Sequence, residues 1–197
     1  MTKEELINLW SRDRNFSDKL IKAYFSVPKE NFVHYRHHDD IHIEKQIPTH
    51  SDYCILKPTD MMLLLHNLDI KKDDKILEIG TGSGYMASIM SKLARRVISV
   101  EILEDIHNLA KENIKKIQRE NIDLYIANGK NGYIPEFPYD KIISTVAFDE
   151  IPEIIINQLS ENGIFICPLK DGLAVEMIKL TKNNNRISQE SIGHFII

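Results

Sequence analysis

Three glycines at alternate positions follow an apolar run in the segment ILEIGTGSGY, residues 76–85. Glycine permits backbone angles that other residues resist, and it lets main-chain N–H groups approach a ligand closely. Glu78 precedes the first glycine by two positions, and Glu101 ends the next apolar run. An acidic side chain about twenty residues after such a loop, at the end of the second strand, accepts hydrogen bonds from ribose hydroxyls. Together these features indicate a nucleoside-binding site at a strand-to-helix turn.

The spacing of the glycines narrows the choice of ligand. It is G-x-G-x-G, which differs from the G-x-G-x-x-G of dinucleotide-binding loops, and it lacks the Lys-Ser/Thr pair of a phosphate-binding P-loop. A carboxylate beside the loop suits a cationic ligand better than a pyrophosphate. S-adenosylmethionine carries an ammonium and a sulfonium group, so we predict that it binds here. The alternative is a strand–helix turn that happens to contain glycines.

These residues must be positioned by a sheet. Apolar, strand-like runs occupy residues 75–79, 96–100, 122–126, 141–145 and 163–168, and they alternate with helix-like segments at 85–94, 104–118 and 152–159. Such alternation predicts a parallel sheet that helices cover on both faces. The segments 174–180 and 187–197 are typical of two strands around a polar turn, which predicts an antiparallel pair at one edge. The predicted class is α/β, with a doubly wound, mostly parallel sheet.

The first third of the chain has a different pattern. Helices are predicted at 3–10 and 17–26, periodicity fades between 31 and 57, and a further helix is predicted at 59–67. The sequence contains no internal repeat and no low-complexity linker. We therefore expect one domain over 1–197, in which residues 1–58 form a helical and loop cap and residues 59–197 form a Rossmann-like core.

Composition bounds the class of protein. A chain of 197 residues with 43% hydrophobic content can bury one core, and its net charge of −4 argues against a nucleic-acid partner. The two cysteines, Cys54 and Cys167, are far apart and have no metal-binding spacing, which suits a reducing compartment. No apolar run approaches the roughly 18 residues of a membrane span. We expect a cytoplasmic protein with no membrane partner.

Several motifs resemble those of the protein-L-isoaspartate O-methyltransferase family, and the resemblance covers nearly the whole chain. SVPKENFVHY, residues 26–35, is similar to the family's V-P-R-E-x-F-V segment, and LEIGTGSGY matches its cofactor loop without change. The segment FPYDKIISTVAFDEIP, followed by QLSENGIFICPL, is similar to the family's fourth strand, next helix and fifth strand. The resemblance implies transfer of a methyl group from S-adenosylmethionine to the carboxylate of isoaspartyl residues in damaged proteins.

The resemblance also implies a set of site residues. Glu101 would hold the ribose, Ile102 would lie under the adenine, and Asn128 and Gly129 would line the edge of the adenine. Thr145 and Ala147, at the end of the fourth strand, would face the methyl group and its acceptor. The remaining cofactor contacts are assigned to Glu78, Gly80, Thr81, Gly82, Ser83, Gly84 and Tyr85, and the remaining acceptor contacts to His50, Ser51, Cys54 and Leu56.

The sequence departs from the family at the acceptor end. Counted back without a gap from Glu78, the family's T-I-S-x-P segment falls on CILKP, so that Leu56 stands where the family has a serine hydroxyl. Loss of one hydrogen bond to a charged group costs about 1.5–3 kcal/mol, or tenfold to a hundredfold in rate. Ser51, Cys54 or Thr59 could supply the contact instead. Asn128 stands where an aspartate is expected near the adenine, and its amide can still form hydrogen bonds.

The sequence is also compatible with two other functions. The protein could methylate a different acceptor, such as a base in transfer RNA, or it could bind the cofactor without catalysis.

The segment HYRHHDDIH, residues 34–42, is rich in potential metal ligands, but its spacing matches no metal site. We interpret it as a solvated or substrate-facing loop and predict no metal.

Overall fold

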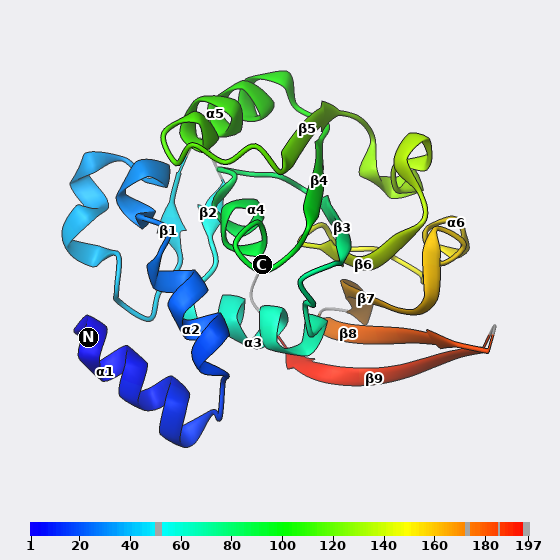
Figure 1. Ribbon diagram of the computed structural model, residues 1–197, viewed down its shortest axis with the longest axis horizontal. Coiled ribbons are helices and arrows are strands. Elements are labelled where there is room, and N and C mark those ends of the chain that lie inside the picture. Colours follow the sequence, from blue (N-terminus) through cyan, green and yellow to red (C-terminus); the bar gives the residue numbers. More distant parts are fainter. Residues whose placement is uncertain (50–52, 172–173, 185, 195–197) are drawn as a thin grey trace.

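The computed structural model describes residues 1–49, 53–171, 174–184 and 186–194, and these contain a seven-stranded sheet (Figure 1). The strand order is β5-β4-β3-β6-β7-β8-β9. The bounds are β3 Lys75–Ile79, β4 Arg96–Glu101, β5 Ile122–Ile126, β6 Tyr139–Ser144, β7 Leu159–Asp171, β8 Ala174–Asn183 and β9 Arg186–His194. Strands β3 to β7 pair in parallel, whereas β8 is antiparallel to both β7 and β9. The predicted α/β class and its antiparallel C-terminal pair are confirmed.

Helices cover both faces of the sheet. Alternate residues of a strand point to opposite sides, so each central strand contributes to two hydrophobic clusters. Ile76 and Val97 belong to one hydrophobic cluster, and their neighbours Leu77 and Ile98 belong to another. The first cluster includes side chains from the first five α-helices, and the second includes Ile155 of the last. The bounds are α1 Lys3–Asn8, α2 Asp18–Phe25, α3 Pro58–Leu68, α4 Tyr85–Met90, α5 Glu104–Lys115 and α6 Glu153–Ile156.

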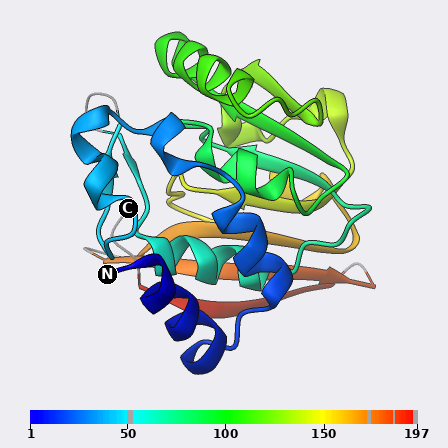
Figure 2. The same cartoon turned by 60° about the vertical axis from the view of Figure 1, so that its left-hand side comes forward.

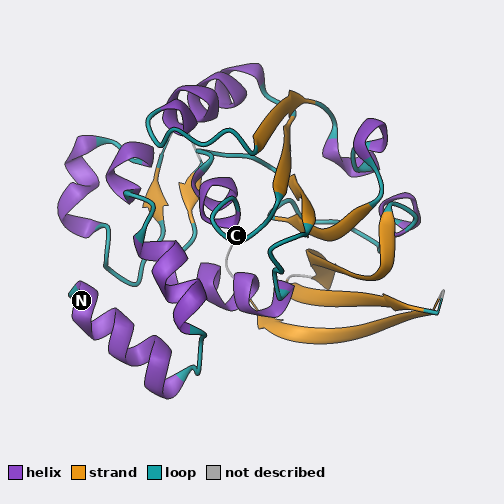
Figure 3. Cartoon of the chain, in the orientation of Figure 1, coloured by secondary structure: helices purple, strands orange, loops and turns teal. Residues whose placement is uncertain are grey.

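The N-terminal segment packs beside α3 on the first face of the sheet (Figure 2). The segment predicted as loop, 31–57, contains more structure than expected: two 3-10 turns, Lys29–Phe32 and Tyr35–Asp40, and the short antiparallel strands β1 Ile47–Pro48 and β2 Cys54–Ile55 (Figure 3). None of these elements is long enough to produce a hydrophobic period, so they could not be predicted from the pattern of apolar residues. Downstream of α1 the chain continues as a π-helical turn, Leu9–Asp13.

The helices that follow β3, β4 and β6 are shorter than predicted. Helix α4 ends at Met90 rather than 94, and α5 ends at Lys115 because Gln118 has a left-handed φ of 50°. Helix α6 spans only four residues, because the chain becomes extended at Leu159 and pairs there with Tyr139 of β6. Strand β7 therefore begins before the predicted residue 163.

A partly buried chain of hydrogen bonds links the N-terminal segment to α3. The indole Nε1–H of Trp10 donates to Thr59 Oγ1 over 2.9 Å, and the Thr59 hydroxyl donates to Glu44 Oε1 over 2.6 Å. The backbone N–H of Thr59 also donates to the Glu44 carboxylate. Because the first N–H groups of a helix lack intrahelical partners, Glu44 caps α3 from a distant part of the chain.

We expect Thr59→Val to lower the free energy of unfolding by about 1–3 kcal/mol, because the buried Trp10 N–H would lose its acceptor. Denaturant unfolding measures the change, and Thr59→Ser, which keeps the hydroxyl, is the matched control. The Ser variant should stay within about 1 kcal/mol of the wild type. A Val variant as stable as the wild type would show that this chain does not fasten the segment.

Candidate functional site

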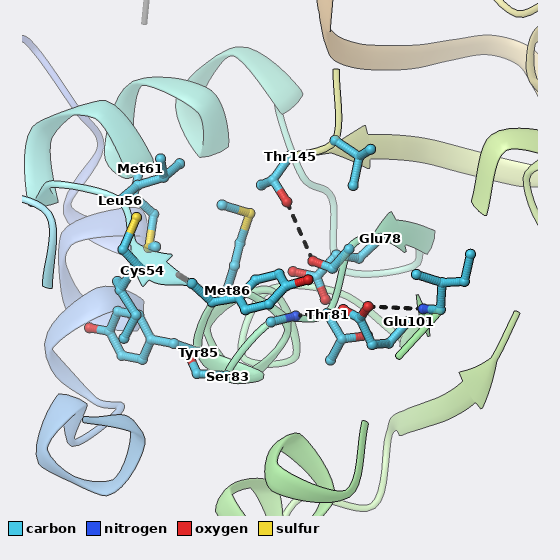
Figure 4. Close-up of a pocket in the computed structure, with 16 residues that line it drawn as sticks. Cys54, Leu56, Met61, Glu78, Thr81, Ser83, Tyr85, Met86, Glu101 and Thr145 are labelled. Carbon is cyan, nitrogen blue, oxygen red and sulfur yellow. Dashed lines mark hydrogen bonds between the residues drawn. The ribbon is translucent and has the colours of Figure 1, made fainter. Parts of the chain in front are cut away.

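A cavity of 420 Å³ lies at the carboxyl ends of β3, β4 and β6. The strand order reverses direction between β3 and β6, and ligands of doubly wound sheets bind at such a point. Glu101 lies at one end of the cavity, and Cys54, Leu56 and Met61 lie at the other, with Glu78 between them (Figure 4). The cavity therefore has a polar end formed by strand termini and an apolar end formed by β2 and α3.

The loop between β3 and α4 requires glycine for two reasons. Gly80 and Gly84 have φ angles of 92° and 84°, in the left-handed region that side chains disfavour. A Cβ on Gly80 would lie 2.9 Å from Thr145 Oγ1, and a Cβ on Gly84 would lie 2.9 Å from Ile114 Cδ1. The loop consequently packs closely against the end of β6 on one side and against α5 on the other.

Three main-chain N–H groups bind the buried carboxylate of Glu101. Gly82 N–H donates to Oε2 over 3.2 Å, while the N–H groups of Ile102 and Leu103 donate to Oε1 over 2.9 and 3.2 Å. An ionised carboxylate has about four acceptor positions, so one remains on Oε2. Glu101 thus orients the loop and still has an acceptor position for one ribose hydroxyl. This acceptor position fits the ribose of S-adenosylmethionine.

Glu78 is buried, and its carboxyl group ends a chain of hydroxyls. Ser99 Oγ donates to Glu78 Oε2 over 2.5 Å, and Thr81 Oγ1 lies 2.6 Å from the same Ser99 oxygen. Burial raises the pKa of Glu78 to about 8; the Ser99 hydrogen bond opposes the rise, and the charge of Glu101 adds to it. Glu78 is therefore largely protonated at neutral pH. A cation placed beside it would favour the ionised form, which fits an ammonium group.

The apolar end of the cavity offers few polar groups. Leu56 is buried and belongs to the first hydrophobic cluster, so no hydroxyl stands at that position. Cys54 is exposed, and partial burial raises the pKa of its thiol, which keeps the thiol neutral. Thr145 lines the cavity, and its hydroxyl donates a long hydrogen bond of 3.5 Å to the Gly80 carbonyl. Thr59 already binds Trp10 and Glu44.

Most of the residues expected at the site line this one cavity. They are Cys54, Leu56, Glu78, Gly80, Thr81, Gly82, Ser83, Tyr85, Glu101, Ile102 and Thr145. Gly84 and Ala147 do not line it, and neither do Asn128, whose side chain accepts from Lys130 N–H, and Gly129, which packs against Ile79. His50 and Ser51 lie outside the described residues.

Sequence reasoning missed five residues that also line the cavity: Tyr53, Ile55, Met61, Met86 and Val146. Met61 and Met86 are buried on helix faces, where an apolar residue normally indicates core packing. Val146 directly follows Thr145, so its position at the carboxyl end of the fourth strand is a sequence signal that indicates a place in the cavity.

Two features that are absent among the described residues bear on other functions. No group of three or more His, Cys, Asp or Glu side chains among them could hold a metal ion. Within the histidine-rich segment, His34 Nδ1 instead accepts a hydrogen bond from the Arg36 N–H. In the same part of the chain, no helix has the length and apolar character needed to cross a membrane.

A family described as protein-L-isoaspartate(D-aspartate) O-methyltransferase matches residues 1–196. A protein-L-isoaspartate O-methyltransferase of Methanoculleus marisnigri is 32% identical over 192 residues, which are 97% of this chain and 87% of that protein. The chain belongs to the protein-L-isoaspartate O-methyltransferase family. Membership indicates protein-L-isoaspartate O-methyltransferase activity with S-adenosylmethionine as the methyl donor, and the predicted family and cofactor are confirmed.

Solved structures agree with this assignment. A protein-L-isoaspartate O-methyltransferase superposes with a TM-score of 0.86 at 26% identity, and the match covers 99% of this chain and 64% of that longer chain. A Plasmodium falciparum structure described as a protein-L-isoaspartate O-methyltransferase in complex with S-adenosyl-L-homocysteine gives a TM-score of 0.84 at 22% identity, over 98% of this chain and 95% of that one. The second comparison shows the fold alone.

We expect Glu101→Gln to weaken S-adenosylhomocysteine binding by roughly 1.5–3 kcal/mol, because a charge-assisted hydrogen bond to the ribose becomes a neutral one. Calorimetry measures the affinity, and thermal unfolding checks that the variant folds. Glu104→Gln, on the exposed start of α5, is the matched control and should bind normally. Unchanged affinity in a folded Glu101→Gln variant would remove Glu101 from the site.

In the absence of ligand, Glu78→Gln should become more stable relative to the wild type as the pH rises. Because the folded-state pKa is about 8 and the ordinary value is 4.5, folded Glu78 keeps a proton that the unfolded chain loses between these values. The free energy of unfolding of the wild type therefore falls as the pH rises from about 5 to 8, whereas Gln has no such loss.

The melting temperature of Glu78→Gln should therefore rise relative to that of the wild type between pH 5.5 and pH 8.5. The expected rise is roughly 2–4 °C for each kcal/mol by which the free energy of unfolding increases relative to the wild type. The same variant should bind S-adenosylhomocysteine more weakly, because an amide cannot ionise beside the ammonium group. If the two proteins differ in melting temperature by the same amount at both pH values, Glu78 does not stay protonated in the fold.

Proposed function

We propose that this protein methylates the free carboxylate of isoaspartyl residues in polypeptides, and that the 420 Å³ cavity is the site of the reaction. The observation that supports this most is the juxtaposition of Glu101, Glu78 and an apolar end in one cavity. In this assignment Glu101 binds the ribose, Glu78 faces the methionine ammonium, and the acceptor approaches between Leu56 and Thr145. S-adenosylmethionine, when bound, supplies a methyl group that its sulfonium activates for transfer.

The reaction needs little acid–base chemistry from the chain. A carboxylate acceptor with a pKa near 4 is already ionised at neutral pH, so no general base is required. The residues at the site instead orient the two reactants and exclude water, effects that can supply several kcal/mol of the barrier. Leu56, Met61 and Met86 are suited to excluding water, and the Thr145 hydroxyl is suited to orienting the acceptor.

The lining of the cavity favours this acceptor over a nucleic acid. Among the described residues that form its walls there is no lysine or arginine, whereas binding to a phosphate backbone depends on such side chains. A transfer-RNA base would also need a stacking or hydrogen-bonding surface beside a basic track. We therefore propose that the partners are isoaspartyl-containing peptides and proteins.

We also propose that residues 1–197 act as one domain, with 1–58 as a cap on the core 59–197, and that the protein works in the cytoplasm. Leu6, Trp10 and Tyr24 of the cap share a hydrophobic cluster with Ile76 of the sheet, which supports a single folding unit. Both cysteines are free thiols, as a reducing compartment allows.

Radiolabelled methyl transfer tests the proposed acceptor directly. The wild-type protein is given labelled S-adenosylmethionine together with an isoaspartyl peptide, its normal aspartyl counterpart, or bulk RNA. We expect label on the isoaspartyl peptide alone. Label on RNA would establish a different acceptor, and binding of S-adenosylhomocysteine without any transfer would establish a non-catalytic relative.

Leu56→Ser should raise transfer to an isoaspartyl peptide about tenfold or more, because it restores a hydroxyl that can align the reacting carboxylate. The gain should be in kcat, and the affinity for S-adenosylhomocysteine should stay the same. Leu56→Ala removes the same bulk without adding a hydroxyl and is the matched control. A rise of equal size in both variants, or a wild type with family-like turnover that gains nothing from serine, would show that the acceptor contact lies elsewhere.

A further inference from the structure

Lys29 is a buried cation outside the cavity of the proposed reaction. Its side chain is 4% exposed, and Nζ donates to Tyr24 Oη over 2.6 Å and to the Ile41 carbonyl over 2.9 Å. No ion pair of Lys29 occurs among the residues that the structure describes. Burial of an ammonium group without a bound carboxylate is costly, so this lysine requires an explanation other than stability.

Lys29 reaches the cofactor loop through two tyrosines. Its Nζ lies 5.1 Å from the ring centroid of Tyr24 and 5.3 Å from that of Tyr85, which are cation–π distances. The two tyrosine side chains interact by a hydrogen bond, and their rings meet edge to face at 5.9 Å. Burial raises the pKa of both tyrosines, and this hydrogen bond opposes the rise in Tyr24 and adds to it in Tyr85. Tyr85 Oη–H therefore donates to Tyr24 Oη, which also accepts from Lys29.

Tyr85 is the residue through which this contact reaches the reaction site. It is the first residue of α4, directly after the glycine loop, and its side chain points away from Glu101 toward the N-terminal helices (Figure 4). It lines the 420 Å³ cavity and also a second cavity of 210 Å³ that Tyr24 and Lys29 line. Tyr85 is buried between these two cavities, where its ring packs against Tyr24 and Phe32, and Lys29 adds a charged contact to the same ring.

We propose that Lys29 is a positioning residue for methyl transfer: through Tyr24 it holds the Tyr85 side chain against the apolar end of the cavity. This inference rests on the proposed function, because it assigns the effect to the transfer step. Glu101 and Glu78, to which the ribose and ammonium contacts are assigned, line the 420 Å³ cavity and not the cavity at Lys29, so we expect the effect mainly in kcat rather than in cofactor affinity.

The positive charge of Lys29 contributes to the proposed positioning of Tyr85. Burial lowers the pKa of Lys29 to about 8, and the carboxylates of Glu44 and Glu30 oppose that shift. The other titratable groups around it are Lys3, His42, Tyr24 and Tyr85. Burial and the charge of Lys29 lower the pKa of His42, so His42 is uncharged at pH 7 and above. Loss of the proton on Lys29 above pH 8 weakens its hold on both rings.

Three variants test the role. Lys29→Met removes the charge at similar length, and Tyr24→Phe removes the hydroxyl but keeps the ring. Lys22→Met, on the exposed side of α2, is the control. We expect Lys29→Met and Tyr24→Phe to lower kcat for an isoaspartyl peptide about tenfold while the Kd for S-adenosylhomocysteine changes less than twofold. Lys29→Met should unfold at or above the wild-type temperature, since a buried charge is replaced by an apolar side chain.

The pH profile separates positioning from a merely structural role. Wild-type kcat should fall as the pH rises through about 8. Lys29→Arg, which stays charged, should recover the kcat that Lys29→Met loses, and its kcat should not fall over this pH range. Glu78 is common to both proteins, so their difference isolates residue 29. An unchanged kcat in Lys29→Met, or a loss of kcat explained by a lower melting temperature, would overturn the inference.

A readout independent of activity distinguishes the two proposals. In amide NMR spectra, signals of Gly82 and Tyr85 should move in Lys29→Met and Tyr24→Phe and stay in place in Lys22→Met. If the wild type transfers no methyl group to the peptide, the proposed function fails, and these signals alone decide whether Lys29 holds Tyr85. Signals that do not move in either variant would overturn the inference even in an active enzyme.

Discussion

The carboxylate of Glu101 is the fixed point of the site, because it binds main-chain N–H groups from two separate segments. Gly82 belongs to the loop after β3, and Ile102 and Leu103 follow β4. The parallel register that places Ile79 beside Val100 brings both segments to the same edge of the sheet. The cavity, its polar end and the start of α4 all follow from this arrangement, so a change of strand register would dismantle the site as a whole.

A second carboxyl group, Glu78, lies within the same edge of the sheet and is costly to bury. The protein meets that cost by leaving Glu78 protonated and hydrogen-bonded to Ser99, at the expense of stability at alkaline pH. Binding sites often retain such unfavourable groups because the ligand removes the cost. Lys29, on the other side of the loop, is a comparable case. Its ammonium group is buried although burial of the charge contributes little to stability, and it lies next to Tyr85, whose position we propose that it fixes.

Much of the core could be predicted from sequence, because each parallel strand is a short apolar run and each covering helix is amphipathic. The loop and Glu101 were predictable because their spacing reflects the register of β3 and β4. The 3-10 turns and the β1–β2 pair were not, since they are held by tertiary contacts such as Glu44 with Thr59 and have no period of their own. The roles of Met86 and Lys29 also depend on packing between segments distant in the chain, which a single sequence does not encode as a pattern.

A crystal structure of the protein with S-adenosylhomocysteine bound would test the assigned contacts directly. We expect a ribose hydroxyl within hydrogen-bonding distance of Glu101 Oε2, at about 2.5–3.0 Å, and the ammonium group beside Glu78. We also expect the sulfur to lie toward Leu56 and Thr145, where the acceptor approaches. A nucleoside bound away from Glu101, or a sulfur directed away from the apolar end of the cavity, would show that these assignments are wrong.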